Sequence, residues 1–183
     1  MRTTLSALLA LLVSSLLAGC AGRPHATAAP DATFIVVRHA EKVDASRDPD
    51  LSAAGHARAQ ALATRLDGHA LAAVYATEFK RTGQTVSPAA AARGLAITAY
   101  PANRPAPDFA ARLRAAHPRG TVLIAGHSNT VPDLVAALCG CAAAPMPDEE
   151  YDRFSIVRIA ADGRARLQVE RYGAPSPPAA PAP

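Results

Sequence analysis

Short apolar segments rich in β-branched residues alternate with segments of helical spacing through the middle of this sequence. The apolar segments are residues 33–37, 71–75, 95–100 and 121–125. The helical segments are residues 52–66, 79–92, 108–117 and 129–138. Two further apolar segments, residues 154–159 and 166–172, flank Ala161-Asp162-Gly163 and predict a hairpin. Because strands that alternate with helices favour parallel pairing, the sequence predicts an α/β fold: a three-layer α/β/α sandwich with a mixed, mostly parallel central sheet.

Single residues mark where these helices begin and end. Ser52 is a candidate N-cap for the first helix, and Asp108 is a candidate cap for the third. Pro88 lies inside the second helix, where a proline kinks the backbone, and Gly94 follows the end of that helix. Pro132 falls in the first turn of the fourth helix, where proline is tolerated.

The first 20 residues have the pattern of a secretory signal. Arg2 supplies a positive charge, and residues 5–17 are an apolar stretch too short to span a bilayer, which needs about 20 residues. The ending Leu17-Ala18-Gly19-Cys20 resembles a bacterial lipobox, which implies cleavage before Cys20 and a lipid on that cysteine. The alternative is an ordinary signal peptide with an incidental Cys20. Ala21 favours the outer membrane, so we expect a cell-envelope lipoprotein that faces the periplasm.

The rest of the chain divides into one domain and two flanking segments. Residues 1–19 are the predicted signal peptide and residues 20–31 a flexible tether of Ala, Pro, Thr and Gly. Residues 32–173 are long enough to form a single domain with its own core. Residues 174–183, rich in Pro and Ala, are predicted to be a disordered tail.

Composition excludes several classes of partner. The formal net charge is only +4 and no stripe of basic and aromatic residues is present, so no nucleic-acid partner is expected. No metal site is predicted either, because Asp44, Asp48 and Asp50 do not have the spacing of an EF-hand loop. The histidines at positions 56, 69 and 117 follow no ligand spacing and are expected at the surface.

Four cationic or imidazole side chains follow the ends of predicted strands. Arg38 and His39 come directly after the first strand, Arg81 lies a few residues beyond the second, and His127 follows the fourth. The carboxyl ends of parallel strands meet at one edge of a sheet, where ligands bind in α/β proteins. Guanidinium groups match phosphate oxygens and stay charged at any working pH. The pattern therefore predicts a phosphate pocket containing His127 and His39.

With these residues in place, the sequence resembles the histidine phosphatase superfamily, whose fold is phosphoglycerate-mutase-like. The matching segments follow the family's order through nearly the whole domain: Val37–Lys42, Leu51–Gly55, Tyr75–Thr85 and Val122–Thr130. The family's Arg-His-Gly is Arg-His-Ala here, at residues 38–40. Together with the lipobox-like segment before Cys20, the resemblance implies a small extracytoplasmic lipoprotein member of this family.

The resemblance also implies roles for individual residues. His39 would attack phosphorus and become a phosphohistidine, which water then hydrolyses. Arg38 and Arg81 would hold the non-bridging oxygens, and His127 would donate to a phosphate oxygen, with Ser128 beside it in the phosphate-binding loop. This scheme needs neither a metal nor another cofactor.

The proton donor to the leaving group is less clearly marked. Larger members supply a Glu or Asp from an insertion, but residues 100–108 are mostly Pro and Ala here. Glu41 and Asp108 are the candidates, and the alternatives are a solvated loop carboxylate and a helix cap. A good leaving group, such as that of a phosphoramidate, needs little acid catalysis. This favours a small phosphatase similar to the phosphohistidine phosphatases over a mutase.

Two functions remain open at this point. One is a lipid-anchored phosphatase acting on a small phosphorylated substrate, and the other is a non-catalytic lipoprotein that binds a phosphorylated or anionic ligand in the same pocket.

The sequence also leaves two states open for Cys139-Gly140-Cys141. The two thiols either pair in a small ring or remain free at a turn that ends the fourth helix.

Overall fold

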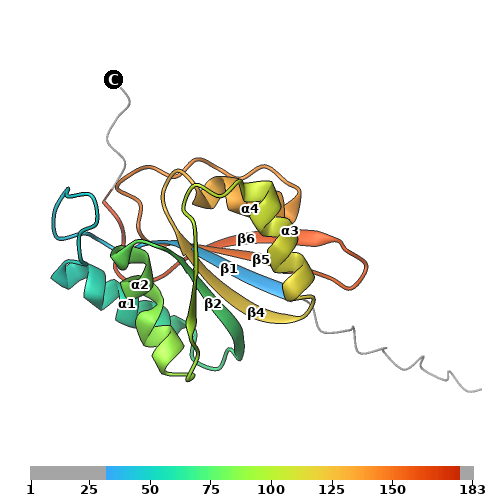
Figure 1. Ribbon diagram of the computed structural model, residues 1–183, viewed down its shortest axis with the longest axis horizontal. Helices are drawn as coiled ribbons and strands as arrows, with labels where there is room; N and C mark the ends of the chain where they lie inside the picture. Colours follow the sequence, from blue (N-terminus) through green and yellow to red (C-terminus); the bar gives the residue numbers. More distant parts are fainter. Residues whose placement is uncertain (1–31, 178–183) are drawn as a thin grey trace, which may run out of the picture.

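The structure is a computed structural model that describes residues 32–177, and it consists of a six-stranded sheet between two pairs of helices (Figure 1). The strands are β1 (Ala32–Arg38), β2 (Leu71–Thr77), β3 (Ile97–Tyr100), β4 (Gly120–Gly126), β5 (Arg153–Ile159) and β6 (Ala165–Arg171). The helices are α1 (Ala53–Arg65), α2 (Lys80–Ala91), α3 (Ala106–Ala116) and α4 (Val131–Cys139). The predicted α/β/α sandwich is confirmed.

The sheet is mixed, with the strand order β3-β2-β4-β1-β5-β6. The pairs β3–β2, β2–β4 and β4–β1 are parallel, whereas β5 is antiparallel to both β1 and β6. The parallel strands are joined through helices, and β5 and β6 form the predicted hairpin around Gly163, whose φ of 82° suits glycine. This topology places β1 and β4 side by side in the centre of the sheet.

Two apolar cores, one on each face of the sheet, hold the layers together. The α3 and α4 side buries Phe34, Phe109 and Leu134 in one cluster. The α1 and α2 side buries Leu62 and Val86 in the other. Successive side chains of β1 alternate between the two clusters, as expected for a strand covered by helices on both faces. The central strands are therefore fixed from both sides.

The helix starts are predicted with mixed success. Ser52 is the N-cap of α1, and its hydroxyl accepts a hydrogen bond from the Gly55 amide at 3.1 Å. Asp108 does not cap α3, because the helix begins earlier, at Ala106, with Pro105 as its N-cap. The chain enters α4 at Val131 rather than at Asn129, and the carboxyl end of β4 is thus followed by a four-residue loop before the helix.

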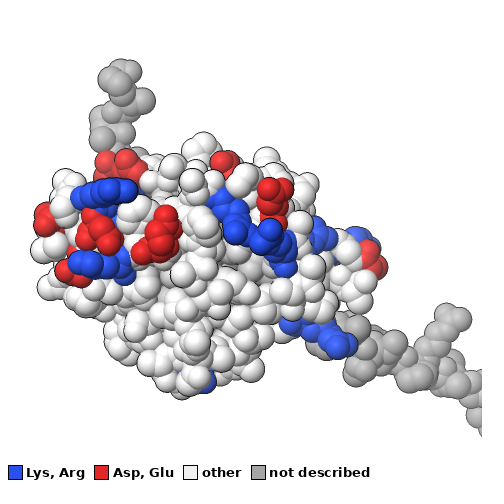
Figure 2. Space-filling model, in the orientation of Figure 1, with Lys and Arg blue, Asp and Glu red and all other residues white. Residues whose placement is uncertain are grey.

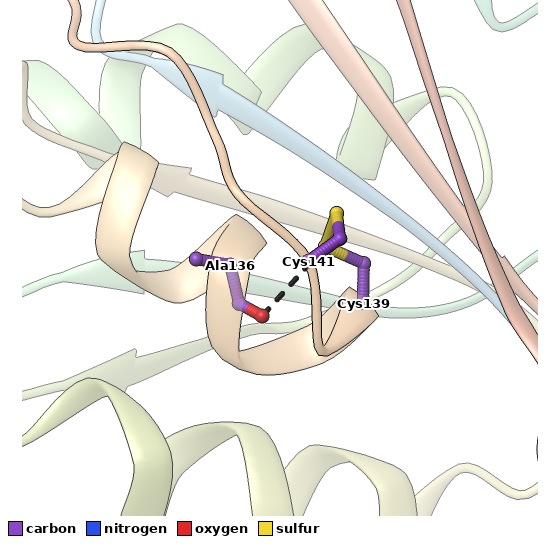
Figure 3. Close-up of a disulfide and its surroundings, with 3 residues drawn as sticks. All are labelled: Ala136, Cys139 and Cys141. Atoms are coloured by element: carbon purple, nitrogen blue, oxygen red, sulfur yellow. Dashed lines mark hydrogen bonds between the residues drawn. A yellow bond between two sulfur atoms is a disulfide. The ribbon is translucent and has the colours of Figure 1, made fainter.

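Cys139 and Cys141 form a disulfide across Gly140 at the end of α4 (Figure 3). Gly140 is the C-cap in the left-handed conformation, with a φ of 62°, so the predicted helix-ending turn is also present. Of the two thiol states left open by the sequence, the structure shows the paired one. The segment that follows the disulfide reaches the end of β1, because the Pro147 and Asp148 carbonyls lie within hydrogen-bond distance of Arg38.

Several sequence predictions lie outside the described residues. These are the signal peptide, the lipidation of Cys20 and the tether before residue 32. Within residues 32–177, no helix is long and apolar enough to cross a membrane. The predicted tail starts at residue 174, but Ser176 is still tied to the domain, because its hydroxyl and amide both hydrogen bond to the Asp152 carboxylate. The domain therefore extends at least to Ser176.

Gly55 provides a test of how α1 is seated. A Cβ at this position would lie 2.2 Å from the Glu41 carbonyl oxygen, so the helix and the chain after β1 must separate to accept it. We expect Gly55→Ala to lower the free energy of unfolding by about 1–3 kcal/mol. Gly83→Ala in α2 is the control, because nothing lies within 4 Å of its Cβ. The free energy of unfolding of Gly83→Ala should rise by up to about 1 kcal/mol, because alanine has the higher helix propensity. Urea unfolding of both variants decides between these outcomes, and equal midpoints would contradict the close packing.

Candidate active site

The parallel pairing of β1 with β4 brings the two histidines of the sequence pattern together. Arg38 is the last residue of β1 and pairs with Gly126, the last residue of β4. The ladder continues one step further, because the His39 amide donates to the Gly126 carbonyl at 2.9 Å. His127 follows directly, and the two imidazole centroids lie 5.3 Å apart. The prediction that both histidines lie at one sheet edge is confirmed.

A cavity of about 510 Å³ opens at this edge. The predicted residues Arg38, His39, Arg81, His127 and Ser128 all line it. The remaining lining comes from the β1–α1 loop, the start of α2, the β3–α3 and β4–α4 loops, and the segment before β5: Lys42, Phe79, Ala102, Asn103, Asn129, Thr130, Asp148 and Tyr151.

His39 is held with one ring nitrogen free. Its Nδ1 lies 2.8 Å from the Ala40 carbonyl oxygen, which can only accept, so Nδ1 carries the proton. Nε2 is then unprotonated and has an available lone pair. Burial of the ring lowers the pKa of His39 to about 3, and the neighbouring Arg38 guanidinium acts in the same direction. The imidazole is therefore neutral, and nucleophilic at Nε2, throughout the physiological pH range.

The loop that carries His39 is anchored to α2. The Ala40 amide donates to the Thr85 hydroxyl at 2.8 Å, and that hydroxyl donates to the Arg81 carbonyl at 2.7 Å. Ala40 itself is fully buried against Leu51 and Ala59. These contacts fix the Ala40 carbonyl that orients His39.

His127 is positioned by a chain of buried hydroxyls. Its Nε2 lies 3.0 Å from Thr77 Oγ1, which lies 2.8 Å from Thr82 Oγ1. Thr82 donates in turn to the Phe79 carbonyl at 2.7 Å, so the Thr77 proton goes to Thr82 and Thr77 accepts from His127. His127 Nδ1 faces Arg81 at 3.4 Å. Burial lowers the pKa of His127 to about 4, and Arg81 contributes to the shift.

Arg38 is fixed by the segment that precedes β5. Its Nη1 lies within hydrogen-bond distance of three carbonyl oxygens, those of Pro147, Asp148 and Glu150. The guanidinium also stacks on Tyr151, with 4.2 Å between its carbon and the ring centroid. The backbone dipoles and the aromatic ring hold this cation in one orientation beside His39.

Arg81 reaches the cavity from the first turn of α2. Its guanidinium lies over the Phe79 ring at 4.3 Å and 3.9 Å from the Asp48 carboxylate. Asp48 also accepts from the Lys80 amide at 2.9 Å, and so acts as a cap on the start of α2. Asp48 thus belongs to a loop that steadies Arg81 at the cavity.

The charges around the cavity favour an anion. The residues that line it include three cations, Arg38, Arg81 and Lys42, and one carboxylate, that of Asp148. Both imidazoles are neutral. Elsewhere, on the face shown in Figure 2, basic and acidic side chains are interspersed rather than gathered by sign. The cavity therefore offers a local excess of positive charge that suits a phosphate group.

The structure does not place either predicted proton donor in this cavity. Glu41 turns toward α1, where its carboxylate accepts from Arg58 Nη2 at 2.7 Å and from Arg58 Nε at 3.0 Å. Asp108 is on the exposed surface of α3 and lines a separate hollow with Arg104 and Arg112. Glu41 was placed near the site by its proximity to His39 in sequence, but the chain turns its side chain toward α1.

Sequence reasoning missed Asp148 and Tyr151. Both line the cavity, yet they come from an irregular segment between α4 and β5 that has no periodicity to locate it. Their only signal in the sequence is an acidic run, Asp148-Glu149-Glu150, immediately before Tyr151. Among residues 32–177, no group of three or more His, Cys, Asp or Glu side chains is arranged to hold a metal ion.

Comparison with protein-family models gives one match in this region. The model of the histidine phosphatase superfamily, branch 1, matches residues 34–104. This range contains the Arg38-His39 pair and Arg81, but it ends before His127. A search of curated proteins found no significant match.

Solved structures share the fold over most of the domain. The protein histidine phosphatase SixA, solved with tungstate, is 21% identical with a TM-score of 0.63, covering 76% of this chain and 96% of that one. An Escherichia coli protein described as a putative α-ribazole-5′-phosphate phosphatase is 18% identical with a TM-score of 0.62, covering 83% of this chain and 99% of that one. A mycobacterial glucosyl-3-phosphoglycerate phosphatase is 16% identical with a TM-score of 0.62, covering 79% and 100%.

The protonation state of His39 is directly measurable. Long-range ¹H–¹⁵N spectra of the imidazoles should show His39 as the neutral Nδ1–H tautomer from pH 8 down to pH 5, because its folded-state pKa is about 3. In urea the same ring should titrate near the ordinary value of about 6.5. Since the folded pKa is the lower one, His39 costs stability as the pH falls from 6.5 toward 3. A folded His39 that titrates near 6.5 would contradict the buried, neutral assignment.

The position of Glu41 predicts a structural rather than a chemical phenotype. The Arg58 side chain is only 3% exposed and that of Glu41 23%, so Glu41→Gln leaves a buried cation without its partner. We expect the free energy of unfolding to fall by about 2–4 kcal/mol. Asp162→Asn, at the exposed pair with Arg164, is the control and should leave the free energy of unfolding close to that of wild type. Urea unfolding measures both, and a Glu41→Gln variant of unchanged stability would argue against this role.

Proposed function

We propose that the chain is a member of the histidine phosphatase superfamily, whose branch 1 model matches residues 34–104, and that it hydrolyses a phosphomonoester or phosphoramidate through a phosphohistidine on His39. The observation that carries this proposal is the state of His39. Its Nε2 lone pair is available in an open cavity, between two fixed guanidinium groups, while Nδ1–H is held by the Ala40 carbonyl. A neutral imidazole in that setting can attack the phosphorus of a bound phosphoryl group through Nε2.

In the first step, His39 Nε2 attacks phosphorus and the bond to the leaving group breaks. The Ala40 carbonyl stabilises the positive charge that develops on the imidazole, because Nδ1–H already donates to it. Arg38 and Arg81 bind the non-bridging oxygens as charge shifts toward the leaving group. Both cations are preorganised by backbone or aromatic contacts, so little reorganisation is needed at the moment of reaction.

His127 and the loop after β4 complete the phosphate site in this proposal. Ser128 and Asn129 line the cavity just ahead of α4, whose amino-terminal end favours negative charge. The His127 imidazole packs edge-on to His39 and faces Arg81 through Nδ1. With a phosphate bound, we expect His127 to take up a proton and donate to a phosphate oxygen, since the added negative charge raises its pKa.

In the second step, water attacks the phosphoryl group and the bond to Nε2 breaks, which returns His39 to its resting state and releases inorganic phosphate. The electrostatic part of both steps is supplied by the arginines, so we propose that catalysis is independent of metal ions. The cavity of about 510 Å³ suits a small substrate. The similarity to a protein histidine phosphatase supports a phosphoramidate as one such substrate.

We further propose that the protein works in the bacterial cell envelope, attached to the outer membrane through a lipid on Cys20 and facing the periplasm. The lipobox-like ending at residues 17–20 supports the anchor. The Cys139–Cys141 disulfide is consistent with an oxidising compartment, where such bonds persist.

Replacement of His39 tests the proposal. We expect wild type to hydrolyse p-nitrophenyl phosphate or phosphoramidate in the presence of EDTA. His39→Ala should lose at least about 10³-fold in kcat, because the attacking Nε2 is removed and the Nε2 of the other imidazole, His127, is held by Thr77. His56→Ala is the control, since His56 is exposed on α1 away from the cavity. Activity that survives His39→Ala, or that disappears with EDTA, would overturn the mechanism.

A non-catalytic function is the second candidate, and the placement of the predicted acids favours it. Neither Glu41 nor Asp108 reaches the cavity, so a protein that binds a phosphorylated or anionic ligand without turnover fits the same geometry. Calorimetric titration with inorganic phosphate or tungstate, run beside the hydrolysis assay, separates the two. Tight binding without hydrolysis of any substrate in a phosphometabolite panel supports the binding protein.

A further inference from the structure

One carboxylate does reach the cavity. Among the described residues that line it, Asp148 is the single acidic side chain. It comes from the segment between the Cys139–Cys141 disulfide and β5, far in sequence from Glu41 and Asp108. Asp148 is therefore the group to examine for the proton transfers that hydrolysis requires.

The protein holds one of the two oxygens of the Asp148 carboxylate. Its Oδ1 accepts from the Ser128 hydroxyl at 2.6 Å and lies 3.8 Å from Arg38 Nη2. Its Oδ2 has no hydrogen-bond partner within residues 32–177, and the side chain is 83% exposed. One oxygen is thus fixed against the phosphate-binding loop, and the other is available to water.

The backbone around Asp148 is also fixed relative to His39. The Asp148 carbonyl accepts from Arg38 Nη1, as do the nearby carbonyls of Pro147 and Glu150. Tyr151 stacks on the same guanidinium, and its ring centroid lies 6.1 Å from that of His39. The side chain of Asp148 is therefore carried by a segment bound to the residue next to the nucleophile.

Asp148 is ionised at neutral pH. The Ser128 hydroxyl holds the pKa of this carboxyl below its ordinary value, and the positive charges of Arg38 and Lys42 lower it further. An ionised carboxylate accepts a proton and does not donate one. This excludes Asp148 as a ready acid for the leaving group and leaves it suited to activate water.

We propose that Asp148 is the general base of the second half-reaction, an inference that rests on the phosphohistidine mechanism proposed above. Asp148 Oδ2 accepts a proton from the water whose oxygen attacks phosphorus. The bond between phosphorus and His39 Nε2 breaks, its electron pair returns to the imidazole, and inorganic phosphate leaves. The proton on Asp148 then passes to solvent, to which the carboxylate is open.

The same assignment restricts the substrate class. With Asp148 ionised, the leaving group receives no proton from it during the first step. Substrates whose leaving group is stable as it departs are therefore favoured: aryl or enol phosphates, acyl phosphates, and phosphoramidates that carry a proton on nitrogen. Simple alkyl phosphates should react more slowly, because an alkoxide must leave without acid catalysis.

The decay of the phosphohistidine tests the proposal most sharply. The full-length protein is phosphorylated with phosphoramidate, excess donor is removed, and the loss of the phosphoryl group is followed by ³¹P NMR or rapid quench into base, where phosphohistidine is stable. We expect Asp148→Asn to slow this decay by about 10²-fold. Because Asp148 takes no part in the phosphorylation of His39, that step should be unchanged in Asp148→Asn. With p-nitrophenyl phosphate, this variant should therefore release about one equivalent of p-nitrophenolate in a burst before slow turnover.

Two control variants separate chemistry from positioning. Ser128→Ala removes the contact to Oδ1 but keeps the carboxylate, so its decay should slow by less than about tenfold. Glu149→Gln changes an exposed neighbouring carboxylate that does not line the cavity, and it should match wild type. Asn at position 148 can still accept from Ser128, so a folding defect is not expected, and circular dichroism checks this.

The outcomes distinguish this inference from the proposed function. Phosphohistidine that decays in Asp148→Asn as fast as in wild type overturns the base assignment and leaves the phosphohistidine mechanism standing. Equal slowing in Ser128→Ala and Asp148→Asn also overturns it, because position rather than basicity would then matter. A wild-type protein that is never phosphorylated overturns both.

Discussion

The parallel register between β1 and β4 is the constraint on which the site depends. It aligns Arg38 with Gly126, so that the next residue of each chain segment is a histidine at the same sheet edge. The apolar side chains of both strands are buried on both faces, and a slip of one residue would turn each side chain to the opposite core. The energy that fixes this register comes from the cores, whereas the proposed chemistry lies a single residue beyond each strand.

In the proposed mechanism, desolvation of His39 and His127 gives these imidazoles their reactivity. Burial disfavours the protonated imidazoles of His39 and His127, and two nearby guanidinium groups act in the same direction. The permanent charge of the site therefore resides on Arg38 and Arg81, whose pKa values stay high enough for full ionisation despite some lowering by burial. Burying the two guanidinium groups beside each other costs free energy in the empty site, and a bound phosphate would offset this cost because it carries the opposite charge. Binding and nucleophilicity thus share one physical origin.

The sequence predicts the fold and the gathering of Arg38, His39, Arg81 and His127 around one cavity well because both follow local rules. The change from β-branched residues to Arg38 and His39 marks the end of the first strand. Because parallel strands have their carboxyl ends at the same edge of the sheet, residues that follow different strands meet there. The orientation of Glu41 toward Arg58, the start of α3 at Ala106 and the arrival of Asp148 depend on tertiary contacts of irregular segments, which carry no periodicity. Glu41, which is close to His39 in sequence, is therefore a weaker candidate for proton transfer than Asp148, which a distant loop brings to the cavity.

The central claim is that His39 Nε2 accepts a phosphoryl group. The most direct measurement is to phosphorylate the wild-type protein with phosphoramidate, quench it in base, and locate the modification by peptide mass spectrometry and ¹H–³¹P NMR. Phosphate on Nε2 of His39, with Nδ1 still protonated, is the result that the hydrogen bond to the Ala40 carbonyl predicts. Phosphate on His127, on Nδ1 of His39, or on no residue while substrate is hydrolysed would contradict the account.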